Sequence, residues 1–323
     1  MRRSGTMEIT AVALEPIHHG AGTKGNTQIL REQPIVLPDG RRASTPFISG
    51  NSLKHAIRAS GAFYALQAMG VDDGALSKPV VDLLFSGGHL LKGGAAVNLE
   101  RARKLEALFP ILGVCGYSAG NTMQASALRV GHLHMLCTEN RWRAPERMQT
   151  HAHAGLLAGH FRDEEFGTRH EASRDRRVAG LLAGEAQQAL VVAKSKALAE
   201  KHPDKGDSSQ MIYDFQVIKP GATFWGRIDF TELAPLELDA LKSALATWCA
   251  GADDDGFLFR VGAKNSIGFG LMRWTLQGAF RVDAPRFEAT EALAPSDGGF
   301  EAYRQHLVDH RDEILDALAE AAG

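Results

Sequence analysis

The sequence lacks several features that mark large classes of protein. Its three cysteines, Cys115, Cys137 and Cys249, are widely spaced and form no C-x-x-C pair. This spacing argues against a disulfide framework or a zinc ribbon and predicts reduced thiols. No apolar run reaches the length that crosses a membrane, and Glu8 interrupts the segment that follows Met1-Arg2-Arg3. We therefore expect no membrane span and no signal peptide, and a cytoplasmic location.

The sequence also has little net charge, which at first argues against nucleic-acid binding. Its formal net charge is −2 at pH 7. That charge is unevenly distributed, because residues 282–323 hold ten acids and three arginines, a net of −7 that leaves +5 for residues 1–281. Residues 24–58 carry six cations and two acids. A local positive field attracts a polyanion more than the total charge does, so composition permits nucleic-acid binding.

The most informative segment is residues 46–58, PFISGNSLKHAIR, which has the pattern of a turn that opens a helix. Its SGNS stretch contains helix-start residues that leave first-turn N–H groups available for an anion. Lys54 and Arg58 are four positions apart, so both cations project from one helix face. The pattern predicts a phosphate-binding helix start, although an ordinary capped amphipathic helix has the same local pattern.

A second segment, residues 261–274, carries three glycines in VGAKNSIGFGLMRW. The Rossmann and P-loop interpretations fail here, because a strand pattern follows the loop and no Gly-Lys-Ser/Thr is present. Glycines allow a backbone to approach a ligand closely. Together with Lys264, this loop can hold a polynucleotide backbone, and alternatively a small nucleotide.

Together the two segments resemble the RAMP superfamily of CRISPR-associated proteins. The first is similar to that family's P-f-I-P-G-S-S-L-K-G-x-x-R segment, and the second to its G-x-x-x-S-x-G-F-G loop. Between them, residues 217–224 (VIKPGATF) resemble the family's strand–Pro-Gly–strand element. The resemblance spans roughly residues 7–280. It is to the backbone subunit of multi-subunit class 1 effector complexes, most of all that of the type IV system.

The predicted elements follow an α+β order. Alternating patterns predict strands at about 7–17, 127–136, 212–218, 223–231, 257–261 and 269–280. Helical patterns lie at about 52–69, 76–85, 99–109, 176–201, 236–250 and 300–321. The last helix has an apolar stripe of Phe300, Tyr303, Leu307, Ile314 and Leu318. Residues 18–45 are predicted to form a long polar loop.

This order fits a ferredoxin-like sheet interrupted by insertions. The resemblance implies the same fold, an RNA-recognition-motif-like palm with helical insertions and a thumb. We expect the palm core to comprise residues 1–140 and 211–281, and the thumb-like insertion residues 141–210. Residues 282–323 are expected to form an acidic C-terminal extension with the terminal helix. A solvated helical lid is the alternative interpretation of the insertion.

The resemblance also raises the question of catalysis. In type III relatives an aspartate after the first strand cuts target RNA, and the corresponding position here is Glu32, preceded by Arg31. A carboxylate beside an arginine is readily held in an ion pair, so we predict a subunit that does not cut. The alternative is a RAMP ribonuclease that cleaves target or precursor RNA with Glu32 or with His18 and His19. Adjacent histidines on a strand point to opposite faces, which argues against concerted action.

The resulting hypothesis is a non-catalytic subunit that binds guide RNA (crRNA) and needs no cofactor or metal. Its expected partners are complementary target DNA or RNA, copies of itself along the guide, and other CRISPR effector subunits. The predicted RNA-binding residues are Lys24, Asn26, Arg31, Asn51, Ser52, Lys54, His55, Arg58, Gly262, Lys264, Asn265, Ser266 and Gly268. Trp274 is expected in the core, whereas Phe269 could stack on a base.

Overall fold

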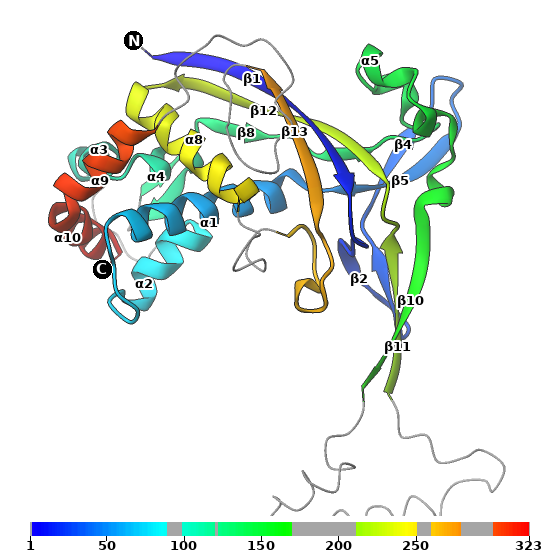
Figure 1. The fold of residues 1–323 in the computed structure, drawn as a ribbon, viewed down its shortest axis with the longest axis horizontal. Coiled ribbons are helices and arrows are strands. Elements are labelled where there is room, and N and C mark those ends of the chain that lie inside the picture. Colours follow the sequence, from blue (N-terminus) through cyan, green and yellow to red (C-terminus); the bar gives the residue numbers. More distant parts are fainter. Residues whose placement is uncertain are drawn as a thin grey trace, which may run out of the picture.

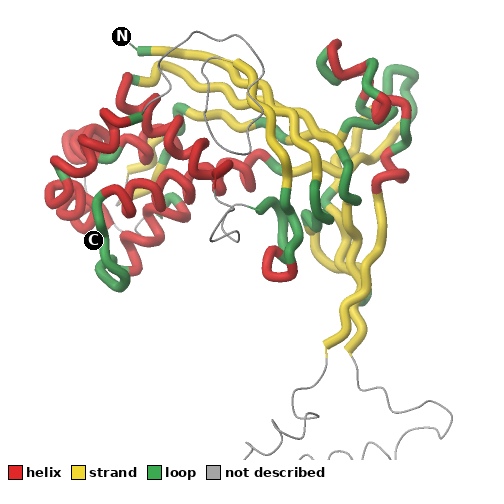
Figure 2. The backbone as a smooth tube through the Cα atoms, in the orientation of Figure 1, coloured by secondary structure: helices red, strands yellow, loops and turns green. Residues whose placement is uncertain are grey.

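The computed structural model of the chain describes residues 2–88, 99–119, 122–169, 211–250, 260–278 and 300–322. Within these ranges, one antiparallel sheet forms the centre of the molecule, with helices packed against one of its faces (Figure 1). A second, four-stranded sheet extends away from the first on the side opposite most of the helices (Figure 2). No helix in the described ranges is long and apolar enough to cross a membrane.

The central sheet has the strand order of a ferredoxin-like fold. Its order is β13-β1-β12-β9-β5-β4, and β8 also pairs with β12. The last strand therefore lies beside the first, and both neighbours of β1 run antiparallel to it. The strands are β1 (Arg3–Ala13), β4 (Glu32–Val36), β5 (Arg42–Ile48), β8 (Leu128–Val130), β9 (Leu133–Met135), β12 (Thr223–Leu233) and β13 (Met272–Gly278). The predicted α+β, ferredoxin-like architecture is confirmed.

Two helices, α1 (Gly50–Ala68) and α8 (Pro235–Ala250), fill the helical positions of this fold. Alternation along β1 turns Met7 and Ile9 toward the core, where both are buried. Leu53 and Ile57 of α1 are also fully buried. Each such side chain contributes about 2 kcal/mol of hydrophobic free energy. This packing fixes the start of α1 against the sheet.

The C-terminal segment forms two helices where one was predicted. They are α9 (Glu301–Asp309) and α10 (Arg311–Ala322), and the helical backbone is interrupted at His310. The predicted apolar stripe is confirmed, because Tyr303, Leu307, Ile314 and Leu318 are fully buried and Phe300 packs against them in the main core. These acidic helices are therefore packed into the core of the palm.

The remaining helical elements of the described chain are additions to the ferredoxin-like palm. They are α2 (Lys78–Val81), the π-helix η1 (Asp82–Ser86), α3 (Leu99–Leu108), α4 (Pro110–Cys115), α5 (Glu146–Gln149) and the 3₁₀ turns η2 (Arg141–Arg143), η3 (Ala152–Gly155), η4 (Ala158–Phe161) and η6 (Asn265–Ile267). A short hairpin pairs β6 (Tyr117–Ala119) with β7 (Thr122–Gln124). Trp274 is buried against Trp248, as expected for a core residue.

The prediction of a long loop at residues 18–45 is wrong. The segment forms two hairpins, which contribute β2 (Gly20–Lys24), β3 (Thr27–Leu30), β4 and most of β5. The turns that join them are Gly25-Asn26 and residues 37–41 around Asp39-Gly40. Gly25 and Gly40 have φ of +62° and +84°, values that glycine adopts without strain. The segment therefore forms strands because it pairs with other strands, although its polar sequence predicts a loop.

The second sheet joins the β2–β3 hairpin to β10, which belongs to the predicted thumb-like insertion. Its order is β10-β11-β3-β2, with β10 (Arg162–Arg169) and β11 (Met211–Ile218) antiparallel and β11 parallel to β3. The predicted helix at 176–201 lies outside the described residues, as do residues 257–259 of a predicted strand; residues 260–261 are not in a strand. The strand predicted at 127–136 is broken into β8 and β9 at Gly131-His132.

Candidate nucleic-acid interface

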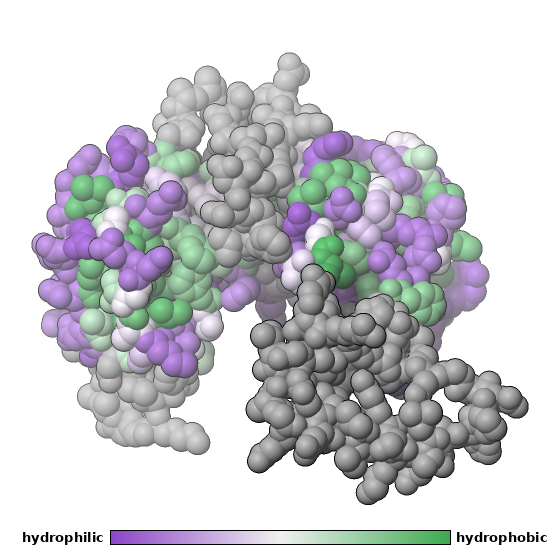
Figure 3. Space-filling model, turned by 60° about the horizontal axis from the view of Figure 1, so that its bottom comes forward, coloured by the Kyte–Doolittle hydropathy of each residue, from purple (hydrophilic) through white to green (hydrophobic). Residues whose placement is uncertain are grey.

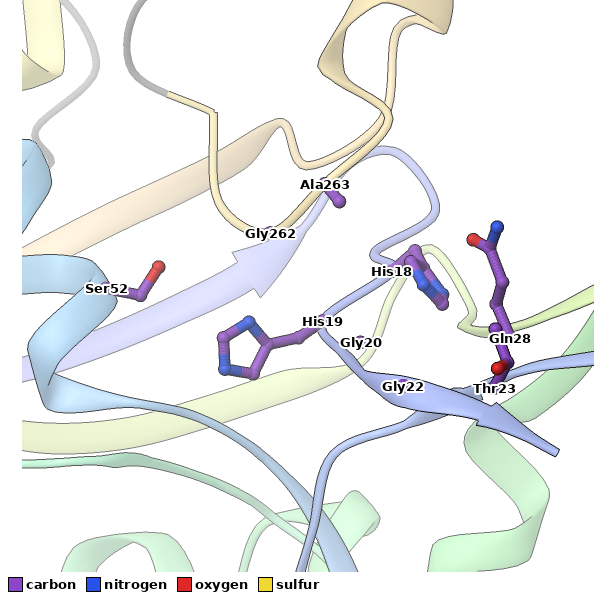
Figure 4. A pocket seen from close by; sticks show the side chains of 9 residues that line it. All are labelled: His18, His19, Gly20, Gly22, Thr23, Gln28, Ser52, Gly262 and Ala263. Atoms are coloured by element: carbon purple, nitrogen blue, oxygen red, sulfur yellow. The ribbon is translucent and has the colours of Figure 1, made fainter.

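Three segments that are distant in the sequence meet at one open hollow of about 390 Å³. They are the segment from His18 through the β2–β3 hairpin, the start of α1, and the glycine loop at 262–263 (Figure 4). The lining residues are His18, His19, Gly20, Gly22, Thr23, Gln28, Ser52, Gly262 and Ala263. Both motifs singled out in the sequence therefore contribute to the same concave site.

The glycine loop is held directly against the segment that follows β1. The Ala263 N–H donates to the His18 carbonyl at 2.8 Å, and the Gly270 N–H donates to the Pro16 carbonyl at 2.8 Å. Gly262 has φ of +82°, and a Cβ there would stand 2.5 Å from the His18 carbonyl oxygen. Only glycine fits both the conformation and the space, so Gly262 sets the distance between the two walls.

The start of α1 is capped more completely than the sequence predicts. The Ser49 side chain accepts from the Ser52 N–H at 3.2 Å. The Ser49 N–H donates to His19 Nε2 at 3.2 Å, and the Gly50 N–H donates to His132 Nδ1 at 2.9 Å. The expectation that first-turn N–H groups stay available for an anion is therefore wrong for Gly50 and Ser52, whose N–H groups donate to His132 and to the Ser49 side chain.

The predicted residues of α1 fall into different environments. Ser52 lines the hollow, whereas Asn51 and His55 are exposed. Lys54 is half-buried with no ion-pair partner among the described residues, and burial lowers the pKa of its ammonium group. A half-buried cation without a counter-ion gains free energy from an anionic ligand, which makes Lys54 the best candidate phosphate contact on this helix.

Arg58 has a structural role that its position in the motif does not reveal. Its Nη2 donates to the carbonyl oxygens of Cys115 at 3.0 Å and Gly116 at 2.5 Å. Those carbonyls end α4 and have no partner within that helix. Arg58 therefore ties α1 to α4, and its Nη1 is buried with no hydrogen-bond partner among the described residues.

The glycine loop places its predicted residues around the 3₁₀ turn η6. Lys264 adopts the left-handed conformation, with φ of +64°, and its ammonium lies 3.9 Å from the centre of the Phe215 ring. Ser266 is exposed, and a Cβ added at Gly268 would meet no atom within 4 Å. The Asn265 Oδ1 is buried and accepts no hydrogen bond from the described residues. Phe269 is buried against Phe215, which removes it from base stacking.

The predicted contacts on the first hairpin lie at its solvent-facing positions. Lys24 and Asn26 are exposed at and beside the β2–β3 turn, next to the lining residue Thr23. Arg31 is exposed, and its Nε donates to the Gly20 carbonyl at 3.4 Å. These cationic and amide groups therefore border the hollow without lining it.

Glu32 is held in an ion pair, but its partner is not the neighbouring arginine. Its carboxylate lies 2.6 Å from Arg162 Nη1, and Arg162 also donates to the Ser44 carbonyl. Glu32 begins β4 and Arg162 begins β10, so the pair joins the central sheet to the second sheet. No group of three or more metal-binding side chains occurs in the part of the chain that the structure describes.

Several lining residues were not predicted, among them Thr23, Gln28 and Ala263. A signal for the first two was present, because Gly-Asn between two short alternating runs is a two-residue hairpin sequence. His132, which accepts a hydrogen bond from the start of α1, was not predicted at the site either. Its contact with Gly50 joins residues 82 positions apart, and no local pattern predicts such a contact.

The His19 cap makes stability sensitive to acid. Burial, together with the Arg31 guanidinium, lowers the pKa of His19 from 6.5 to about 4. Between these values the unfolded chain binds a proton that the folded chain does not, so the free energy of unfolding falls as pH is lowered from 6.5 to 4. The expected loss at His19 is about 2–3 kcal/mol.

Chemical denaturation at a series of pH values measures this loss. In His19→Gln the amide oxygen still accepts from the Ser49 N–H but does not titrate, so the pH dependence should flatten by the amount due to His19. His134, whose pKa burial also lowers to about 4, should keep the rest of the slope. A variant profile parallel to that of the wild type would contradict the assignment.

Comparison with known proteins shows a solved structure that shares this fold. No family model and no curated protein matches the chain. Among solved structures, a chain described as "Type IV-B CRISPR Complex" superimposes with a TM-score of 0.52 at 16% sequence identity, covering 87% of this chain and 94% of that one. The chain shares the fold of that chain.

A second solved structure, Thermofilum pendens Csc2, aligns over 99% of this chain and 82% of that chain. It has 12% identity and a TM-score of 0.38, so the fold assignment rests on the first comparison. In this fold, the two motifs that carried the sequence resemblance are the two that meet at the hollow.

Proposed function

We propose that the chain is a guide-RNA-binding backbone subunit of a class 1 CRISPR effector complex, of the type IV system, and that it holds the guide without cutting it. Copies would bind head-to-tail along one RNA and present its bases to complementary DNA or RNA, beside other effector subunits. A heterologous contact that does not close generates a helical filament of such copies.

One observation carries this proposal: the convergence of the two RAMP motifs on a single polar hollow. Its lining consists of glycines, an alanine and hydrogen-bonding side chains, and Lys54, Arg31 and Lys24 belong to the segments that form it. The face viewed from below mixes hydrophilic and hydrophobic residues over its described surface (Figure 3). A groove that offers neutral donors with cations nearby suits a phosphate backbone read without regard to sequence.

The non-catalytic part of the proposal is supported by the state of the alternative catalytic groups. Glu32 is paired with Arg162, so its carboxylate is held by a counter-ion. His19 uses Nε2 to accept from the Ser49 N–H, and His18 and His19 project to opposite sides of the chain in Figure 4. Concerted cleavage needs one group that takes the 2′-hydroxyl proton and a protonated group that delivers a proton to the leaving oxygen. His19, whose pKa is lowered to about 4 by burial, is neutral near pH 7 and does not suit the second role.

The test is binding of labelled single-stranded RNA in the presence of Mg²⁺. Affinity should rise with RNA length and fall steeply with salt, and the recovered RNA should be intact. Lys54→Ala should weaken binding and reduce the salt slope by about 0.7 for each phosphate that the protein no longer neutralises. Lys78→Ala is the matched control, since Lys78 is an exposed lysine paired with Asp82 outside the hollow.

The outcomes separate the competing functions. An unchanged salt slope in Lys54→Ala would reject the contact between Lys54 and a phosphate. RNA fragments that disappear in Glu32→Ala would favour a ribonuclease. Stoichiometric binding of a mononucleotide without dependence on RNA length would favour a nucleotide-binding protein.

A further inference from the structure

A hydrogen bond to Nδ1 of His18 decides whether the ring's other nitrogen, Nε2, is a hydrogen-bond donor or an acceptor toward the hollow. His18 is 3% exposed and packs edge-on against Phe215, with ring centres 6.0 Å apart. Its Nδ1 lies 2.7 Å from the Gln216 carbonyl oxygen. A carbonyl has no proton to give, so Nδ1 must carry the hydrogen, and in the neutral ring Nε2 is then a hydrogen-bond acceptor.

The Nε2 atom of His18 has no hydrogen-bond partner among the described residues, and Gly20 keeps it uncovered. A Cβ at position 20 would stand 2.9 Å from this nitrogen. Gly20 does not have a positive φ, so the space beside the imidazole, not the backbone conformation, requires glycine here. His18 and Gly20 both line the hollow, which therefore receives an acceptor from a buried, immobile ring.

The His19 ring presents a hydrogen-bond donor, and not an acceptor, to the same hollow. Its Nε2 accepts the Ser49 N–H at 3.2 Å, so the hydrogen of the neutral ring is on Nδ1. Burial keeps the ring neutral by lowering its pKa to about 4. No described residue accepts a hydrogen bond from Nδ1. The charged and titratable groups nearest to His19 are Arg31, His18 and His132.

We propose that His18 and His19 each contact the RNA backbone: His18 Nε2 accepts from a ribose 2′-hydroxyl, and His19 Nδ1–H donates to a phosphate oxygen. This inference rests on the proposed function and adds how the site distinguishes RNA from DNA. An unprotonated phosphate oxygen cannot donate to His18 Nε2, whereas a hydroxyl or a base N–H of the bound strand can. Of these two, the 2′-hydroxyl recurs at every nucleotide, which suits a guide bound without regard to its sequence.

Two substitutions isolate His18 Nε2. In His18→Asn the amide nitrogen can still donate to the Gln216 carbonyl, but the acceptor in the hollow is lost. Gly20→Ala keeps the imidazole and covers Nε2. Affinities of the full chain are measured at about pH 8, where imidazoles are neutral, for single strands of one sequence made as RNA, DNA and 2′-fluoro RNA. The 2′-fluoro strand retains an acceptor but has no hydroxyl donor.

The wild type should prefer RNA over both DNA and 2′-fluoro RNA by about tenfold, the value of one hydrogen bond of about 1.4 kcal/mol. Both variants should lose that preference. His19→Gln, which retains the helix cap, should weaken RNA and DNA binding equally. Thermal unfolding of each variant provides the control for folding.

Three results would overturn the inference. The first is 2′-fluoro RNA that binds as tightly as RNA, and the second is a preference for RNA that survives in a folded His18→Asn variant. A preference that depends on base identity instead of the sugar would assign His18 Nε2 to a base N–H. In each case RNA binding persists, so the proposed function stands; a chain that binds neither RNA nor DNA would reject both.

Discussion

Gly262→Ala should destabilise the protein by about 3 kcal/mol and abolish RNA binding. The left-handed conformation at φ of +82° costs a non-glycine residue about 1–2 kcal/mol. The new methyl group would also stand 2.5 Å from the His18 carbonyl oxygen, so the loop must move away from residues 18–19. That movement breaks the Ala263–His18 hydrogen bond and separates two walls of the hollow.

Gly268→Ala in the same loop is the matched control. Gly268 has φ of +94°, so alanine there carries a similar conformational cost, but no atom lies within 4 Å of its added Cβ. Denaturation and RNA titration of both variants separate strain from steric displacement. If both variants bind RNA equally, the distance between the glycine loop and His18 is not part of the binding site.

Gly50→Ala is expected to have the largest effect on stability, at least about 3 kcal/mol. A Cβ at position 50 would stand 2.1 Å from the Val130 carbonyl oxygen and 2.9 Å from that of Gly131. Both contacts are with backbone, which cannot rotate away as a side chain does. The first turn of α1 must therefore shift, and the Gly50–His132 hydrogen bond should lengthen or break.

Gly155→Ala provides the reference for this measurement. Gly155 does not have a positive φ, and an added Cβ would meet nothing within 4 Å. Its substitution should leave the midpoint of urea denaturation nearly unchanged or raise it slightly, because alanine restricts the unfolded chain. A midpoint for Gly50→Ala close to that of Gly155→Ala would contradict the packing of α1 against β8 and β9.

The sequence was sufficient to predict the palm because its periodic patterns are local. Helix α1 was predicted at 52–69 and observed at Gly50–Ala68, and α8 at 236–250 and observed at Pro235–Ala250. In both, a run of buried apolar positions at helical spacing is bounded by residues that start or stop helices. The two motifs meet at the hollow, and each has a glycine at a close contact with another segment, Gly50 and Gly262.

The sequence was insufficient where a residue's role depends on a distant partner. Arg58 bonds to carbonyls at the end of α4, Glu32 pairs with Arg162, and the Ser49 and Gly50 N–H groups donate to His19 and His132. None of these partners lies within one helical turn or one hairpin of the residue concerned. The hairpins at 20–48 were missed because their polar strands gain stability from pairing in two different sheets.

The most direct test of the central claim is to locate RNA on the purified chain. The chain is co-expressed with a guide RNA and irradiated, and the cross-linked peptides are identified by mass spectrometry. The structure predicts cross-links in residues 18–28, 51–55 and 262–266, which meet at the hollow. Cross-links confined to α9 and α10, or a chain that purifies without RNA, would contradict the proposal that this hollow holds a guide strand.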